Sequence, residues 1–127
     1  MKKIYFPILI LCLFCLSSCN FNTNDSKGAL VIRNNSENAN IYISAVYTKE
    51  KESSGYQLVW SGKISSNSSE FIKLDEGNYS IKVAAVNSLY DLFSSINYYE
   101  TGYNIYKELK IDEFINVTFD GSGIYFE

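Results

Sequence analysis

Short runs in which apolar and polar residues alternate limit this chain to a fold built from β-strands. In the run Tyr79–Val86, Ile81 and Val83 share a face with Tyr79, while Lys82 lies on the opposite face. Successive side chains of a strand point to opposite faces of its sheet, so this pattern predicts one buried and one solvated face. The residues after position 18 contain no proline and are rich in Tyr, Phe, Ile and Val, which favour strands.

About seven strands are predicted from these runs. They are Ala29–Arg33, Ile41–Thr48, Tyr56–Ile64, Phe71–Leu74, Tyr79–Val86, Tyr103–Ile111 and a final region in which Phe114–Phe119 and Ile124–Phe126 are separated by a turn or a bulge. Strands of this number and spacing favour a mainly β fold, a sandwich of two antiparallel sheets.

Local pairing is predicted from the turns between the runs. Ala29–Arg33 and Ile41–Thr48 are expected to form an antiparallel pair, with Ala45 and Tyr47 on the same face as Ile41 and Ile43.

A hairpin is predicted where Phe71–Leu74 and Tyr79–Val86 flank Asp75–Asn78, because Gly77 and Asn78 are residue types that accept positive φ. Ser88–Ile96 departs from alternation. Its apolar residues recur at helical spacing after a capping-box pattern, which predicts one short helix. Trp60, the only tryptophan, is expected to fill the core.

The stretch LDEGNYSIKV, residues 74–83, resembles a recurrent element of transthyretin-like and PEGA-type β-sandwich domains. In those domains a strand, a turn with glycine and a strand led by tyrosine follow one another. The resemblance implies a transthyretin-like or immunoglobulin-like sandwich. It carries an expectation about architecture and none about activity.

The N-terminus has the three parts of a cleavable signal peptide. Lys2 and Lys3 precede the uncharged run Ile4–Leu16, and small residues then lead to Cys19. A helix of that run would be about 20 Å long, which is short against a hydrocarbon core of about 30 Å. The run is therefore expected to direct export rather than to span a membrane.

The residues Leu16-Ser17-Ser18-Cys19 resemble the lipobox of bacterial lipoproteins. The resemblance implies that signal peptidase II cleaves between Ser18 and Cys19, with diacylglycerol on the cysteine sulfur and an acyl chain on its amino group. Such chains hold a protein on a bilayer almost permanently. The alternative is an ordinary secretory signal cleaved near Ser18, with Cys19 an incidental thiol.

This interpretation divides the chain into a signal peptide (1–18), a lipidated tether (19–28) and a β-sandwich domain (29–127). The cell envelope is the expected location. Asn20 is not the aspartate that retains lipoproteins at the inner membrane in some bacteria, which favours the outer membrane. The membrane is thus an expected partner, through the lipid anchor alone.

Composition excludes several classes of function. Removal of residues 1–18 from the 127-residue chain leaves 109 residues, with Cys19 the only cysteine, so no internal disulfide can form. Nine basic and 14 acidic side chains remain, which argues against nucleic acid as a partner. The chain has no histidine, which excludes Ser-His and Cys-His nucleophilic pairs and leaves no zinc-ligand set.

Acidic residues are the remaining candidates for chemistry. They are Asp75 with Glu76, Asp112 with Glu113, and Asp120. All lie at predicted turns, where aspartate is favoured for backbone reasons, and none has the spacing of a calcium loop. No catalytic residue, metal or cofactor is therefore expected.

An aromatic cluster is the one feature that suggests a binding role: Tyr90, Phe93, Tyr98, Tyr99, Tyr103 and Tyr106. If exposed, these rings would form a binding patch; the alternative, which is favoured here, is that they cover an open end of the core. The expected function is a non-enzymatic, lipid-anchored module that binds a protein or glycan at the periplasm or cell surface. A structural or assembly accessory of a larger envelope complex is the alternative.

Overall fold

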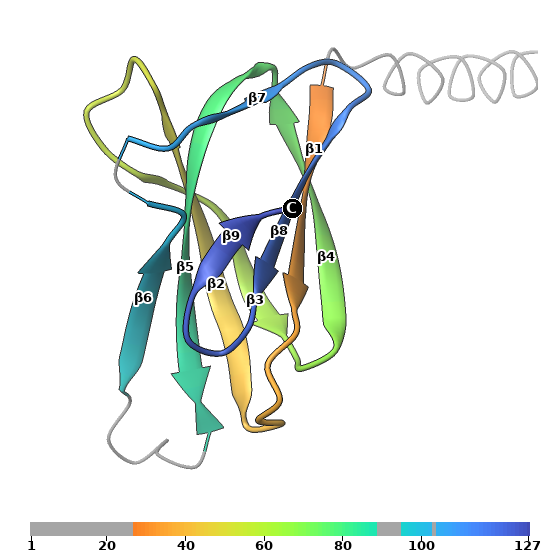
Figure 1. The fold of residues 1–127 in the computed structure, drawn as a ribbon, viewed down its shortest axis with the longest axis vertical. Helices are drawn as coiled ribbons and strands as arrows, with labels where there is room; N and C mark the ends of the chain where they lie inside the picture. Colours follow the sequence, from red (N-terminus) through yellow and green to blue (C-terminus); the bar gives the residue numbers. More distant parts are fainter. Residues whose placement is uncertain (1–26, 89–94, 103) are drawn as a thin grey trace, which may run out of the picture.

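The computed structural model describes residues 27–88, 95–102 and 104–127, so Ser18, Cys19 and most of the tether lie outside it. Figure 1 shows the described strands in two layers. They are β1 (Lys27–Asn34), β2 (Ile41–Glu50), β3 (Gln57–Ile64), β4 (Ser68–Asp75), β5 (Gly77–Asn87), β6 (Ile96–Glu100), β7 (Lys107–Leu109), β8 (Phe114–Phe119) and β9 (Ile124–Phe126). In these ranges there is no α-helix, and hence no helix able to cross a membrane.

The two sheets have four and five strands. The first sheet has the order β4-β1-β8-β9, and the second has the order β3-β2-β5-β6, with β7 also paired to β5. Neighbouring strands are antiparallel except β1 and β8, which run parallel. The predicted β-sandwich is confirmed.

The two predicted local pairings are wrong. β4 pairs with β1 and β5 pairs with β2, so Glu76 links two layers and does not close a hairpin. β1 and β2 likewise lie in different sheets. Gly77 and Asn78 are not among the residues with positive φ. Turn residues indicate where a strand ends, but they serve equally well in a link between sheets.

Two further segments differ from prediction. Most of the predicted helix Ser88–Ile96 lies outside the described residues, and Ile96 itself begins β6, opposite Val86. Of the strand predicted over Tyr103–Ile111, the described residues contain the three-residue β7 alone. Between β6 and β7, Gly102 has a positive φ of 124°, a conformation that glycine adopts readily.

At the N-terminal end, β1 begins at Lys27, inside the segment predicted as tether. At the C-terminal end, the residues Asp120–Gly123 form a turn between the antiparallel strands β8 and β9, so the final region is two strands and not one bulged strand.

The core lies between the two sheets and contains residues from both. Its buried members are Leu30, Ile32, Ile43, Val46, Ile64, Ile72, Leu74, Tyr79, Ile81, Val83, Ala85, Leu109, Ile115, Val117, Phe119 and Ile124. Burial of each large side chain stabilises the fold by roughly 1.5–3 kcal/mol. Trp60 packs against this cluster from β3, as predicted, although it remains partly exposed.

A buried asparagine connects the layers at one end of the sandwich. The side chain of Asn34, at the end of β1, donates hydrogen bonds to the backbone carbonyls of Ile41 (3.0 Å) and Ile64 (2.9 Å) in the other sheet. Its oxygen accepts a hydrogen bond from the backbone N–H of Ser36 at 3.0 Å. A buried amide that satisfies several backbone groups at once is costly to remove.

Replacement of Asn34 with Ala should lower the free energy of unfolding by about 2–4 kcal/mol, because two carbonyls and one N–H lose their partner. Urea denaturation measures this loss. Asn35→Ala, at the exposed neighbouring position, is the matched control and should change stability little. Equal stability of the two variants would show that the hydrogen bonds of Asn34 do not hold the layers together.

Candidate binding surface

The outer face of the second sheet, which points away from the core, carries a group of tyrosines. We call this surface the tyrosine face and define it by Tyr42, Tyr47, Tyr56 and Tyr98 with Leu58 and Ile96. In the strand register Tyr42 lies opposite Val86, Tyr47 opposite Lys82, and Tyr98 opposite Ala84. The partners of these three tyrosines all belong to the outer side of β5, because Val83 and Ala85 point into the core.

A bulge in β2 places Tyr47 on this face. The pairing of β2 with β5 slips by one residue between Ile43 and Ala45. As a result Ile43 and Val46 both point into the core, where each is fully buried, and Tyr47 points outward. Bulges are known to redirect side chains in this way. The prediction that Ile41, Ile43, Ala45 and Tyr47 share one face is therefore wrong.

A second bulge lies at the edge of the same sheet. Val46 pairs with Trp60 and Tyr47 pairs with Leu58, which leaves Val59 as an extra residue in β3. Trp60 can then pack inward while Leu58 remains exposed on the outer face. The two irregularities together place Tyr47 and Leu58 on the outer face while Val46 and Trp60 pack inward.

Lys82, in the central strand β5, lies among three of the tyrosine rings. Its Nζ is 4.6 Å from the ring centroid of Tyr56, 5.0 Å from that of Tyr47 and 5.4 Å from that of Tyr98. The rings of Tyr47 and Tyr98 are themselves 6.3 Å apart with an interplanar angle of 58°. An ammonium group over the face of an aromatic ring is attracted by the ring quadrupole, so these rings hold the charge of Lys82 in place.

Polar contacts fix Tyr56 beside Lys82. Its hydroxyl shares a hydrogen bond of 3.1 Å with the hydroxyl of Ser80, and it lies 3.5 Å from a carboxylate oxygen of Glu100. Partial burial raises the pKa of Tyr56 above its ordinary value of 10.0. The phenol therefore remains protonated at neutral pH and is available for hydrogen bonding.

The structure distributes the predicted aromatic cluster over different surroundings. Tyr98 is 57% exposed on the tyrosine face, whereas its neighbour Tyr99 points inward and contacts Phe119, with ring centroids 5.1 Å apart. Tyr106 is half-buried near β7. The remaining three members of the predicted cluster, Tyr90, Phe93 and Tyr103, lie outside the described residues.

Sequence reasoning missed Tyr42, Tyr47, Tyr56 and Lys82 as surface neighbours of Tyr98. Strict alternation puts Tyr47 in the core, and nothing in the sequence marks the bulge that turns it outward. The outward side of β5 could have been recognised, because Lys82 faces away from Ile81 and Val83 in the alternating pattern.

The first sheet has a smaller exposed aromatic pair on its own outer face. Phe71 in β4 is 65% exposed and Phe114 in β8 is 60% exposed. Their rings meet edge to face with centroids 6.2 Å apart. This pair has two rings, against the four tyrosine rings of the tyrosine face.

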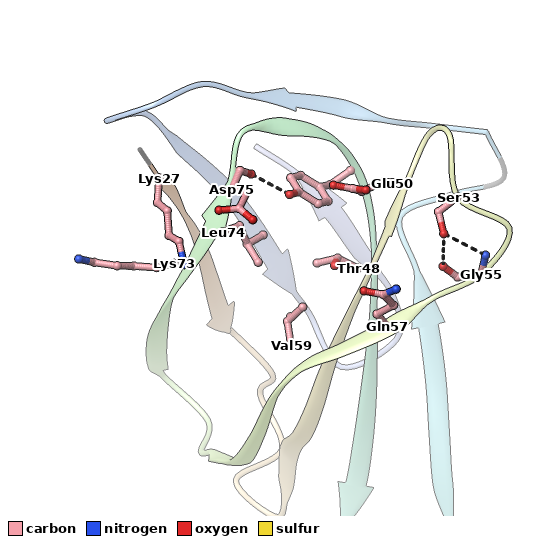
Figure 2. A pocket seen from close by; sticks show the side chains of 11 residues that line it. Lys27, Thr48, Glu50, Ser53, Gly55, Gln57, Val59, Lys73, Leu74 and Asp75 are labelled. Atoms are coloured by element: carbon pink, nitrogen blue, oxygen red, sulfur yellow. Dashed lines mark hydrogen bonds between the residues drawn. The ribbon is translucent and has the colours of Figure 1, made fainter. Parts of the chain in front are cut away.

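A polar pocket lies between the layers at the end of the sandwich where β1 begins. Figure 2 shows its lining, which comes from β1 and β4 in one sheet, from β2, β3 and β5 in the other, and from the loop between β2 and β3. Its volume is about 350 Å³. Within it the hydroxyl of Tyr79 donates a 2.7 Å hydrogen bond to the backbone carbonyl of Asp75, and burial raises the pKa of Tyr79 to about 12. This phenol acts as a neutral structural donor.

The acidic residues considered as catalytic or metal-binding candidates lie at turns between strands or at the connection between the two sheets. Asp120 accepts hydrogen bonds from the backbone N–H groups of Ser122 and Gly123, both at 2.8 Å, and from the hydroxyl of Tyr125 at 2.7 Å. The Tyr125 hydrogen bond, followed by that of Ser122, lowers the pKa of Asp120 to about 2. Asp112 has a positive φ of 61° in the turn before β8.

Among the described residues, no group of three His, Cys, Asp or Glu side chains could hold a metal ion.

Comparison with known proteins adds no functional assignment. No model of a protein family matches the chain, and no curated protein matches its sequence.

Tyr98 and Tyr99 should respond differently to replacement by Ser. Tyr99→Ser removes a ring that packs on Phe119, and should lower the free energy of unfolding by about 2–4 kcal/mol. Tyr98→Ser removes an exposed ring and should cost less than about 1 kcal/mol. Thermal denaturation of the two variants compares them directly. Similar losses in both would show that Tyr98 is also a packing residue.

Proposed function

We propose that this chain is a bacterial envelope lipoprotein whose sandwich domain is a non-enzymatic binding module. The lipid on Cys19 anchors it, with the outer membrane favoured over the inner, and the tyrosine face contacts a partner at the periplasm or the cell surface.

The observation that carries this proposal is the exposed ring of Tyr98 beside Tyr47 and Tyr56 on an open sheet face. Tyrosine is enriched at binding hot spots, because it offers a large rigid area with a polar tip. Monomeric proteins seldom leave such groups of rings in water without a function.

The anchor and the chain geometry are compatible with this role. Seven residues lie between Cys19 and Lys27, so eight residue steps join them, and a fully extended chain of that length spans at most about 29 Å. An anchored domain would therefore stay near the bilayer, with the β1 end of the sandwich towards it. The tyrosine face runs along the side of the domain and would remain accessible.

A second candidate function is an accessory role in an envelope complex. The exposed pair Phe71 and Phe114 favours it, because two phenylalanines without polar groups suit a permanent protein contact. That contact would use the first sheet. The two candidates therefore predict different interaction surfaces.

Photo-crosslinking in the native host separates them. A photoreactive residue in place of Leu58 probes the tyrosine face, and one in place of Phe71 probes the first sheet. We expect an adduct of raised mass, protein or glycan, from position 58, and we expect Tyr98→Ser to abolish it. An adduct from position 71 alone would favour the accessory role. The lack of an adduct at both positions would contradict both functions.

The anchor has its own test. Wild-type protein should partition into the detergent phase, and its intact mass should match a chain that begins at Cys19 and carries acyl chains. Cys19→Ser should lose both properties. An unmodified wild-type protein in the aqueous phase would mean that the lipobox resemblance is accidental.

A further inference from the structure

The tyrosine face carries excess positive charge although the chain as a whole is acidic. Lys63 lies 4.8 Å from the ring centroid of Tyr42, and Lys82 lies among the other three tyrosines. Lys49 lies opposite Ser80 in the strand register, and the hydroxyl of Ser80 is hydrogen-bonded to that of Tyr56. Against these three lysines the same face has Glu100, which lies opposite Lys82 in the strand register. The formal charge of the whole chain is −3.

These lysines have no carboxylate partner within the described residues. The ion pair found there joins Lys110 to Glu108, at 3.9 Å, and no carboxylate of a described residue lies within 4.0 Å of the ammonium groups of Lys49, Lys63 or Lys82. Lys82 is half-buried, and three rings restrict its position. An anion that reaches it meets a cation that is already ordered, which reduces the entropic cost of binding.

The rings add a second requirement on the ligand. Tyr47 and Tyr98 flank Lys82 from the neighbouring strands β2 and β6, and Tyr98 is largely exposed. The face of a pyranose ring that is rich in C–H groups packs on an aromatic ring, while its hydroxyls bond to polar tips such as that of Tyr56. Several rings spread over one sheet face suit a polymer that repeats both the sugar ring and the charge.

We propose that the tyrosine face binds an acidic polysaccharide, with sugar rings on Tyr98 and Tyr47 and sugar carboxylates against Lys82 and Lys63. This inference rests on the proposed binding function and specifies its ligand class. The carboxylate side chains of an acidic peptide would satisfy the lysines but have no apolar ring face to stack on the exposed tyrosines, whereas each unit of an acidic polysaccharide offers both a ring and a charge.

Binding is measured with the full-length protein, extracted in detergent from the membranes that contain it. Titration calorimetry compares polygalacturonate, alginate and hyaluronate with methyl-esterified polygalacturonate, which has the same rings without charge, and with polyglutamate, which has charge without rings. We expect binding to at least one acidic polysaccharide. We expect at least tenfold weaker binding to the ester and to polyglutamate, and weaker binding in high salt.

Two variants test the two parts of the site. Lys82→Gln should weaken binding about tenfold, since a charge-assisted contact is lost. Tyr98→Ser should weaken it by a similar factor through lost stacking. Lys73→Gln, which removes an exposed lysine from the first sheet, is the matched control and should leave affinity unchanged. The thermal midpoint of each variant shows whether it remains folded.

The outcomes separate this inference from the proposed function. Equal binding of polyglutamate and the acidic polysaccharides would overturn the role of the rings, and equal binding of the ester would overturn the role of the lysines. If none of the acidic polysaccharides binds but position 58 still gives an adduct in cells, the ligand assignment is wrong and the binding module stands. If no acidic polysaccharide binds and position 58 gives no adduct, both the ligand assignment and the proposed binding function are wrong.

Discussion

Burial of Ile43 and Val46 on the same side of β2 is the constraint on which the outer surface of this protein depends. A strand with perfect alternation cannot bury two residues three positions apart, because they point to opposite faces. The bulge between Ile43 and Ala45 resolves this conflict. The core gains both side chains, and Tyr47 is turned outward onto the tyrosine face. Core packing and the candidate binding surface therefore have the same structural origin.

The connections between the layers matter as much as the layers. Glu76 alone joins β4 in one sheet to β5 in the other, and the side chain of Asn34 connects the opposite end through the carbonyls of Ile41 and Ile64. The described domain contains no cysteine and therefore no disulfide. Such contacts and the apolar core hold the two sheets against each other. Within the second sheet, the strand register of β5 with β2 and β6 keeps Lys82 beside the rings of Tyr47 and Tyr98.

On the tyrosine face, Lys82 and Glu100 lie opposite each other on neighbouring strands but do not form an ion pair. A lysine on a sheet commonly pairs with a carboxylate, but here three rings surround Lys82 while Glu100 lies near Tyr56. Each cation–π contact at a partly exposed site contributes only about 0.5–1 kcal/mol, so the arrangement adds modestly to stability. Its greater effect is to order a positive charge within an aromatic surface, which is a useful property for recognition.

The sequence by itself determined the fold class and the positions of most strands, because alternation and polar turns are local properties. It also predicts the export signal and the anchor at Cys19, from residues that the structure does not describe. Only the tertiary structure decided which strands pair, since the turn residues around Glu76 suit a hairpin and a link between sheets equally. It also decided the site: Tyr47 and Lys82 meet across two strands, and the bulge that brings them together arises from packing of distant parts of the chain, which no short stretch of sequence records.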